Sequence, residues 1–135
     1  MEQEQYDPRF LQGVDDFNRR EFFGAHETWE AVWIDENGGA KDFYKGLIQV
    51  AVCLLHFGNG NTRGARKLYL SSRRYLDDYR PRYRGVDVDR LLGDVHRCCA
   101  DLAASAEDPP RGKLDMDLLP VLELAPLART SGSGA

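Results

Sequence analysis

A helical run of large apolar residues near the N-terminus most constrains how this chain can fold. At about 100° per residue, Trp29 and Trp33 lie within roughly 20° of Phe22 on a helical wheel. His26 and Glu30 project into the same apolar arc, at roughly 40° and 80° from Phe22. Burying an ionisable group costs free energy unless the group is paired. The pattern therefore predicts a helix that carries a polar site within its apolar face.

A capping box predicts where this helix starts. Asn18 is suited to the N-cap, and Glu21 three residues later can reach back to its backbone N–H. Phe17 and Phe22 on either side of the cap would form a hydrophobic staple. We therefore assign Asn18 and Glu21 a structural role and predict a helix that runs to about Ile34. The residues expected to widen its apolar arc are Phe23, Ile34, Ala25 and Val32.

Helical periodicity continues along the chain, and no segment shows a convincing alternation of a strand. Further helices are predicted over about 40–57, 62–80 and 88–106, with Asn61 as the N-cap of the second and Asp87 as that of the third. The helix over 40–57 is apolar nearly all round, which places it at the centre of a bundle or against a partner subunit. Gly46 in its interior suggests close approach of another helix, beneath the tryptophans.

The two ends of the chain lack this periodicity. Residues 1–13 are predicted to be an irregular lead-in with at most a short helix. Residues 109–135 combine leucines with prolines, which indicates an extended apolar arm over the bundle or over a second subunit. We predict a single all-α domain over 1–125, a compact bundle of about four main helices in antiparallel hairpins. Residues 126–135 are expected to be a disordered tail.

Composition narrows the class of protein. The chain has 135 residues and a net charge of -4, typical of one ordinary globular domain. We expect no membrane span and no secretory signal, because a long apolar run and a basic leader are both missing. Cys53, Cys98 and Cys99 show no metal-binding spacing and are expected to be buried free thiols. We therefore expect a cytoplasmic protein, one that forms a homodimer.

The predicted polar site extends to the next helix. His26 and Glu30 are four residues apart and share a helix face. If the two helices form an antiparallel hairpin about a turn near residue 37, Gln49 lies level with His26, and Tyr44 lies level with Glu30. His56 falls roughly 11–12 Å further along at 1.5 Å per residue, too far to share an ion with His26 within the hairpin.

Three interpretations of this cluster stay open. His26 and Glu30 have a spacing that suits two ligands of a divalent metal, although a zinc site usually takes three or four. The cluster could instead be a polar network that fixes the register of the two helices. It could also line a small-molecule pocket with Trp29, Trp33 and Tyr44 as walls, and with His26 or Glu27 as acid–base groups. In the network interpretation, Gln49 and Tyr44 are the hydrogen-bonding partners of His26 and Glu30.

A basic stripe is the other candidate feature. The segment Arg63–Arg84 contains eight Lys or Arg residues, and five of them cover one side of the predicted helix. Such a stripe could follow a phosphate backbone. The aromatic residues of the helix point inward, however, so no base-stacking platform accompanies the charges. A solvated face, or a contact with acidic residues of a neighbour, is favoured over nucleic-acid binding.

The segment from Phe17 to Leu76 resembles the domain of unknown function family numbered 309. The residues that carry the resemblance are Phe17-Asn18, Glu21-Phe22-Phe23, Ala25-His26-Glu27, Trp29-Glu30, Trp33, Phe43-Tyr44, Gly46-Leu47-Ile48-Gln49, His56, Gly60-Asn61 and Gly64-Ala65. The resemblance, strongest over 17–80, implies a compact all-helical fold. It also implies the label of metal-dependent hydrolase given to some relatives, with His26 and Glu30 as ligands and Glu27 as general base. The alternative is a non-enzymatic dimeric interaction module whose polar cluster only fixes packing.

Overall fold

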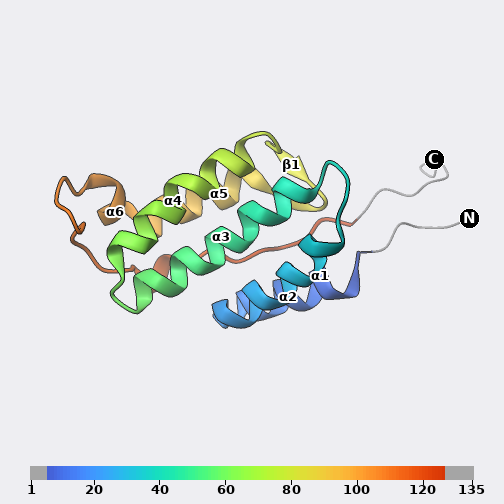
Figure 1. Cartoon of the computed structure of the whole chain (residues 1–135), viewed down its shortest axis with the longest axis horizontal. Coiled ribbons are helices and arrows are strands. Elements are labelled where there is room, and N and C mark those ends of the chain that lie inside the picture. Colours follow the sequence, from blue (N-terminus) through green and yellow to red (C-terminus); the bar gives the residue numbers. More distant parts are fainter. Residues whose placement is uncertain (1–5, 127–135) are drawn as a thin grey trace, which may run out of the picture.

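The computed structural model describes residues 6–126 of the chain, and within them the fold is all-α. Five helices of 11 to 18 residues and a sixth of five residues are joined by short turns and one minimal β-hairpin (Figure 1). In chain order the elements are α1 (Pro8–Asn18), α2 (Phe22–Asp35), α3 (Lys41–Gly58), α4 (Thr62–Asp77), β1 (Arg82–Tyr83), β2 (Val86–Asp87), α5 (Val88–Cys98), α6 (Ala100–Ala104) and the 3-10 turn η1 (Met116–Leu118). The predicted fold class is therefore confirmed.

Helix α3 is the centre of the bundle, as its all-round apolar sequence predicts. It lies between α2 and α4 (Figure 1), and residues such as Phe43, Leu47 and Leu54 are at most 1% exposed. Gly46 permits the approach of α4, because a Cβ atom there would lie 2.6 Å from Cγ of Leu76. The close contact predicted from Gly46 is thus real, but α4 makes it, and the tryptophans of α2 do not.

Helix α1 begins at Pro8, inside the stretch 1–13 that was predicted to be an irregular lead-in with at most a short helix. Asp7 caps its start, since the Asp7 carboxylate accepts a hydrogen bond of 2.8 Å from the backbone N–H of Arg9. Pro8 takes the first helical position, where its fixed φ and missing N–H suit a helix start. Phe10 points into the core and is 2% exposed. The Asp-Pro pair was the sequence signal for this helix.

The predicted capping box at Asn18 and Glu21 is wrong, because Asn18 ends α1 and does not begin α2. The backbone N–H of Glu21 donates to the carbonyl of Asp16, and that of Arg20 donates to Phe17. With Arg20 at a φ of 67°, these two bonds form a Schellman motif, the usual end of a helix. Glu21 takes the N-cap position of α2 without a side-chain capping bond.

The α1–α2 hairpin closes around Trp29. Its indole is completely buried, and Nε1 donates a hydrogen bond of 3.2 Å to the backbone carbonyl of Phe10. Gly13 makes room for the ring, since a Cβ atom there would lie 2.2 Å from that nitrogen. Phe17 and Phe22 pack edge to face at 5.3 Å between ring centroids, so their predicted contact exists without the predicted cap.

The second half of the bundle follows the predicted order with two departures. Asn61 caps α4 as predicted, through a 3.0 Å hydrogen bond from the backbone N–H of Gly64. A two-residue turn at Arg84 and Gly85 joins β1 to β2, and both turn residues have positive φ, as in the hairpin turns that match strand twist. The helix predicted over 88–106 is interrupted at Cys99, which divides it into α5 and α6.

The extended apolar arm predicted after residue 109 lies on its own bundle. It returns along the helices behind α3 towards the end where the hairpin and the start of α1 lie (Figure 1). Leu122 is 6% exposed, and Leu119 and Leu124 also pack against the core. The part of the predicted tail over 127–135 lies outside the described residues. None of the helices over 6–126 is long and apolar enough to cross a membrane.

Gly46→Ala tests the close approach of α3 and α4. The added methyl group must displace Leu76 in a packed core, so we expect the free energy of unfolding to fall by about 1–3 kcal/mol. Chemical denaturation monitored by circular dichroism measures the change. Gly39→Ala is the matched control, because a Cβ atom at Gly39 meets nothing within 4 Å. Equal stability of the two variants would contradict the tight α3–α4 contact.

Candidate functional site

Helix α2 is rotated relative to the prediction, and this rotation decides where the polar pair lies. Its buried residues are Phe22, Ala25, Trp29 and Val32. On the helical wheel this set is centred roughly 40° from Phe22, on the side away from His26. His26 and Glu30 therefore lie at the border of the buried face and do not penetrate it. The residues expected to widen the arc on their side, Phe23 and Ile34, are 55% and 61% exposed.

His26 and Glu30 contact each other as their spacing predicts. Nε2 of His26 lies 3.3 Å from Oε2 of Glu30, with side chains 25% and 49% exposed. The ring of Phe23 lies 5.9 Å from the imidazole, measured between centroids. A carboxylate that holds one imidazole nitrogen fixes the orientation of the ring and directs the other nitrogen elsewhere. Glu27, the predicted general base, is exposed on the next part of this surface.

The second nitrogen of His26 is buried without a partner. Nδ1 of His26 and Oε1 of Gln49 are the buried side-chain nitrogen and oxygen atoms that lack a hydrogen-bond partner within residues 6–126. Lys41 and Lys45 of α3 lie over the Trp33 ring of α2, which fixes the antiparallel register of the two helices. At 1.5 Å per residue, that register places Gln49 within about one turn of His26. Buried polar atoms without partners are rare and mark strain or a binding role.

The aromatic residues predicted to wall a pocket have other roles. Tyr44 is 3% exposed, and its hydroxyl accepts a 3.3 Å hydrogen bond from Nη1 of Arg84 in the β-hairpin. Tyr44 therefore faces away from Glu30, contrary to the prediction, and burial raises the pKa of its phenol. Trp29 is sealed in the α1–α2 hairpin. Trp33 is half-buried at the α2–α3 border, and its backbone carbonyl accepts a 2.9 Å bond from Nζ of Lys41.

His56 takes no part in the cluster. Its Nδ1 lies 3.4 Å from Nδ2 of Asn61, at the turn between α3 and α4. Within residues 6–126, no three side chains of His, Cys, Asp and Glu are placed to hold one metal ion. His26 and Glu30 thus provide two donors that already face each other, fewer than the three or four that zinc usually takes. The donor set in this part of the chain does not complete a metal site.

The three cysteines are free and buried, as predicted. Sγ of Cys98 lies 3.8 Å from Sγ of Cys99, and Sγ of Cys53 lies 3.3 Å from the backbone carbonyl of Ala65. Hydrogen bonding to Cys99, with burial, raises the pKa of the Cys98 thiol far above its ordinary value. A bond with Cys53 is the main cause that raises the pKa of Cys99. Protonated, buried thiols are poor nucleophiles.

Two long-range contacts were missed by the sequence analysis. The Tyr69 hydroxyl on α4 lies 2.7 Å from Nδ1 of His96 on α5. The side chain of Asn18 bonds the backbone of Leu122 in the arm. Neither contact had a local signal, because each joins distant segments of the chain.

Some arginines of the predicted basic stripe form hydrogen bonds within the protein. Arg66 donates to the carbonyls of Ser105 and Glu107, and Arg73 donates to that of Leu92. Lys67 and Arg74 make no hydrogen bond or ion pair with the described part of the chain. The cationic surface left on α4 is therefore smaller than the sequence suggests.

Comparison with known families gives a match to part of the chain. Residues 10–68 match the family model described as domain of unknown function (DUF309). This segment, somewhat less than half of the chain, is similar to the DUF309 family. The match starts before the predicted Phe17, because α1 belongs to it, and ends within α4, before Leu76. The pair His26–Glu30 and Gln49 lie inside the matched segment, whereas α5, α6 and the arm lie outside it.

Two relatives of this chain are themselves named uncharacterized proteins. One, from Aquifex aeolicus (strain VF5), is 26% identical over 103 residues, which cover 74% of this chain and 30% of the relative. The other, YpuF of Bacillus subtilis (strain 168), is 37% identical over 76 residues, which cover 54% of this chain and 44% of the relative. The aligned part thus spans less than half the length of either relative.

Gln49→Leu tests whether the unpartnered Gln49 oxygen is a cost to the fold. Removing a buried acceptor without a partner should raise the free energy of unfolding by up to about 1–2 kcal/mol. Thermal and chemical denaturation measure it. In the control Gln12→Leu, the 3.0 Å bond to Asp16 is lost, so this variant should be less stable. A marked loss of stability in Gln49→Leu would show that its oxygen does have a bonding partner in solution.

Proposed function

We propose that this chain is a non-enzymatic interaction module that forms a homodimer through helix surfaces. The observation that carries the proposal is the exposed side of α2. Phe23, Glu27, Glu30 and Ile34 recur at i, i+4, i+7 and i+11, so they form one stripe, which we call the α2 stripe. Phe23 and Ile34, more than half exposed, lie at its two ends.

The α2 stripe has the character of a docking surface. A helix at the surface of a monomer usually keeps its apolar residues on one face, whereas α2 carries large apolar residues on both. Interfaces commonly combine exposed aromatic and aliphatic anchors with charges that orient the partner. His26 borders the stripe and pairs with Glu30 within it, so the polar residues first noticed in the sequence would help to shape an interface.

The same chain offers a complementary stripe on α4. Arg63, Lys67, Leu70 and Arg74 repeat the same i, i+4, i+7 and i+11 spacing, and all four are exposed. This spacing is that of the seam by which paired helices pack. The α2 stripe is acidic between two apolar ends, and the α4 stripe is basic around the half-exposed Leu70. Opposite charges at matching intervals favour α2 of one copy against α4 of another.

Charge reversal tests this pairing. Glu27→Lys and Lys67→Glu should each weaken self-association by about tenfold or more, because each places like charges across the interface. An equimolar mixture of the two variants should recover a heterodimer, since the reversed charges are again opposite. Sedimentation equilibrium at low and high salt measures both effects. Glu27→Lys leaves the His26–Glu30 pair intact.

The control for charge reversal is Lys113→Glu, an exposed lysine outside both stripes, which should dimerise as the unmodified chain does. A chain that stays monomeric up to millimolar concentration would overturn the proposal. Dimerisation that neither reversal changes would also overturn it, because another surface would then be responsible.

The hydrolase interpretation fits the residues less well. Its two ligands, His26 and Glu30, face each other on one helix, and Gln49 offers only a buried oxygen nearby. Metal hydrolases need an open coordination position beside three protein ligands. A second copy would bring the basic α4 stripe to this surface, and cations are poor neighbours for a metal ion. We therefore derive no metal-dependent step.

Elemental analysis separates the two functions. For protein purified without chelator or an affinity tag, we expect no stoichiometric divalent metal, because the donor set is incomplete. Mass spectrometry of the metal content gives the ratio directly. A stoichiometric metal that is lost in His26→Ala and kept in His56→Ala would favour the hydrolase and overturn the interaction module.

A further inference from the structure

The C-terminal arm is seated on the bundle in the manner of a bound extended peptide. Pro120 and Leu122 are buried and Leu124 is partly buried, whereas Val121 and Glu123 between them are exposed. This alternation has the period of two residues that an extended backbone produces. Every second side chain of the arm thus enters the groove between α1 and α5, and the others face solvent.

A single side-chain amide holds the backbone of the arm at its most buried leucine. Nδ2 of Asn18 donates a 2.9 Å hydrogen bond to the carbonyl of Leu122, and the Leu122 N–H donates a 2.8 Å bond to Oδ1 of Asn18. The amide of asparagine offers the same donor and acceptor as a peptide group. Asn18 therefore binds the arm as a neighbouring β-strand would. It contacts the backbone of Leu122, so this recognition does not depend on the side chain.

A second set of backbone contacts lies three residues further along. The N–H of Ala125 donates a 2.9 Å bond to the carbonyl of Gly85 in the β-hairpin turn, and the hydroxyl of Tyr6 donates to the carbonyl of Ala125. Gly85 is required here, because its φ is +82° and a Cβ atom would collide with that hydroxyl. Both residues that anchor the arm backbone thus have their N–H and C=O groups bonded.

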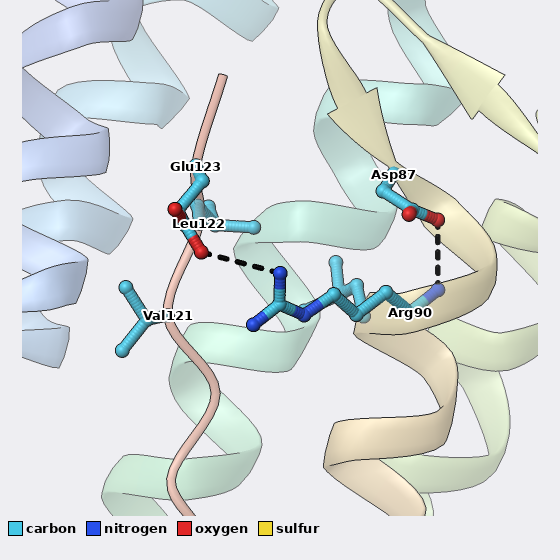
Figure 2. Close-up of a pocket in the computed structure, with 6 residues that line it drawn as sticks. Asp87, Arg90, Val121, Leu122 and Glu123 are labelled. Carbon is cyan, nitrogen blue, oxygen red and sulfur yellow. Dashed lines mark hydrogen bonds and ion pairs between the residues drawn. The ribbon is translucent and has the colours of Figure 1, made fainter. Parts of the chain in front are cut away.

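Side-chain contacts between the arm and α5 are exposed to solvent. Nη1 of Arg90 on α5 lies 3.2 Å from Oε1 of Glu123, and both side chains are exposed (Figure 2). A cavity of about 20 Å³, room for one water molecule, lies between the arm and α5, beside Asp87 and Leu122. The arm therefore does not fill all of the space beside α5.

We propose that the groove between α1 and α5 is a binding site for extended peptides, and that the arm occupies it as an internal ligand. The arm shows the chemistry such a partner needs: Pro-x-Leu-x-Leu in an extended backbone, with an acidic residue between the leucines to meet Arg90. The arm would be displaced when a partner peptide binds. This proposal does not depend on the α2 and α4 stripes.

The connection to the arm is compatible with displacement. The segment from Ala106 to Pro109 is exposed, and most of α1, including Asn18, lies in the segment that matches DUF309, to which the arm does not belong. The groove and its ligand are thus separate parts of the chain, joined by a surface loop.

The test uses the full chain with a protease site inserted between Ala106 and Glu107, two exposed residues. After cleavage, the arm fragment is held only by noncovalent contacts. We expect the helical circular dichroism to be kept, and a labelled synthetic peptide of residues 117–126 to bind while the arm fragment is released. Asn18→Leu, near-isosteric without hydrogen bonds, should weaken peptide binding by about tenfold or more, since two bonds are lost.

A second measurement needs no cleavage. In the uncut Asn18→Leu chain, the amide proton of Leu122 should exchange faster with solvent, while amides of α3 keep their protection. Asn37→Leu, the same substitution in an exposed loop position, is the control and should change neither readout. Unfolding on cleavage would overturn the proposal by showing that the arm is part of the core. Failure of the peptide to exchange, or release of the arm only into a swapped dimer, would also overturn it.

Discussion

Burial of α3 on nearly every side is the constraint on which the rest of this structure depends. A helix that is apolar all round must be covered completely, and α2 and α4 cover only two of its sides. The approach of α4 is set by Gly46, which leaves room for Leu76. On further sides, Phe10 of α1 packs against Tyr44 of α3, and the arm runs behind α3 (Figure 1).

The position of α2 follows from its packing against α1. Trp29 bonds the backbone of Phe10 and fills the space left by Gly13, so the rotation of α2 about its axis is set by one indole ring. That rotation moves His26 and Glu30 to the border of the core. It also turns Phe23 and Ile34 outward, where their exposed area creates the apolar ends of the α2 stripe. The packing of Trp29 inside the α1–α2 hairpin thus determines which residues of α2 form the exposed α2 stripe.

Much of the fold was predictable because it rests on local signals. Helices α2, α3, α4 and α5 follow from periodicity, and the caps at Asn61 and Asp87 follow from short polar side chains next to backbone N–H groups. The missed helix, α1, had a signal in Asp7-Pro8. The capping box was misassigned because Arg20 fills a left-handed position that glycine usually marks, which hid the end of α1.

The sequence by itself determined the all-α class, the central place of α3, the contact of His26 with Glu30 and the family that the matched segment resembles. These depend on spacing along one helix or on short motifs, and spacing survives in any packing. Only the tertiary structure decided which way α2 faces, that Tyr44 bonds Arg84, and that Asn18 holds Leu122. Those features depend on contacts between residues far apart in the chain. Such contacts are determined by how the whole core packs, and no single segment encodes them.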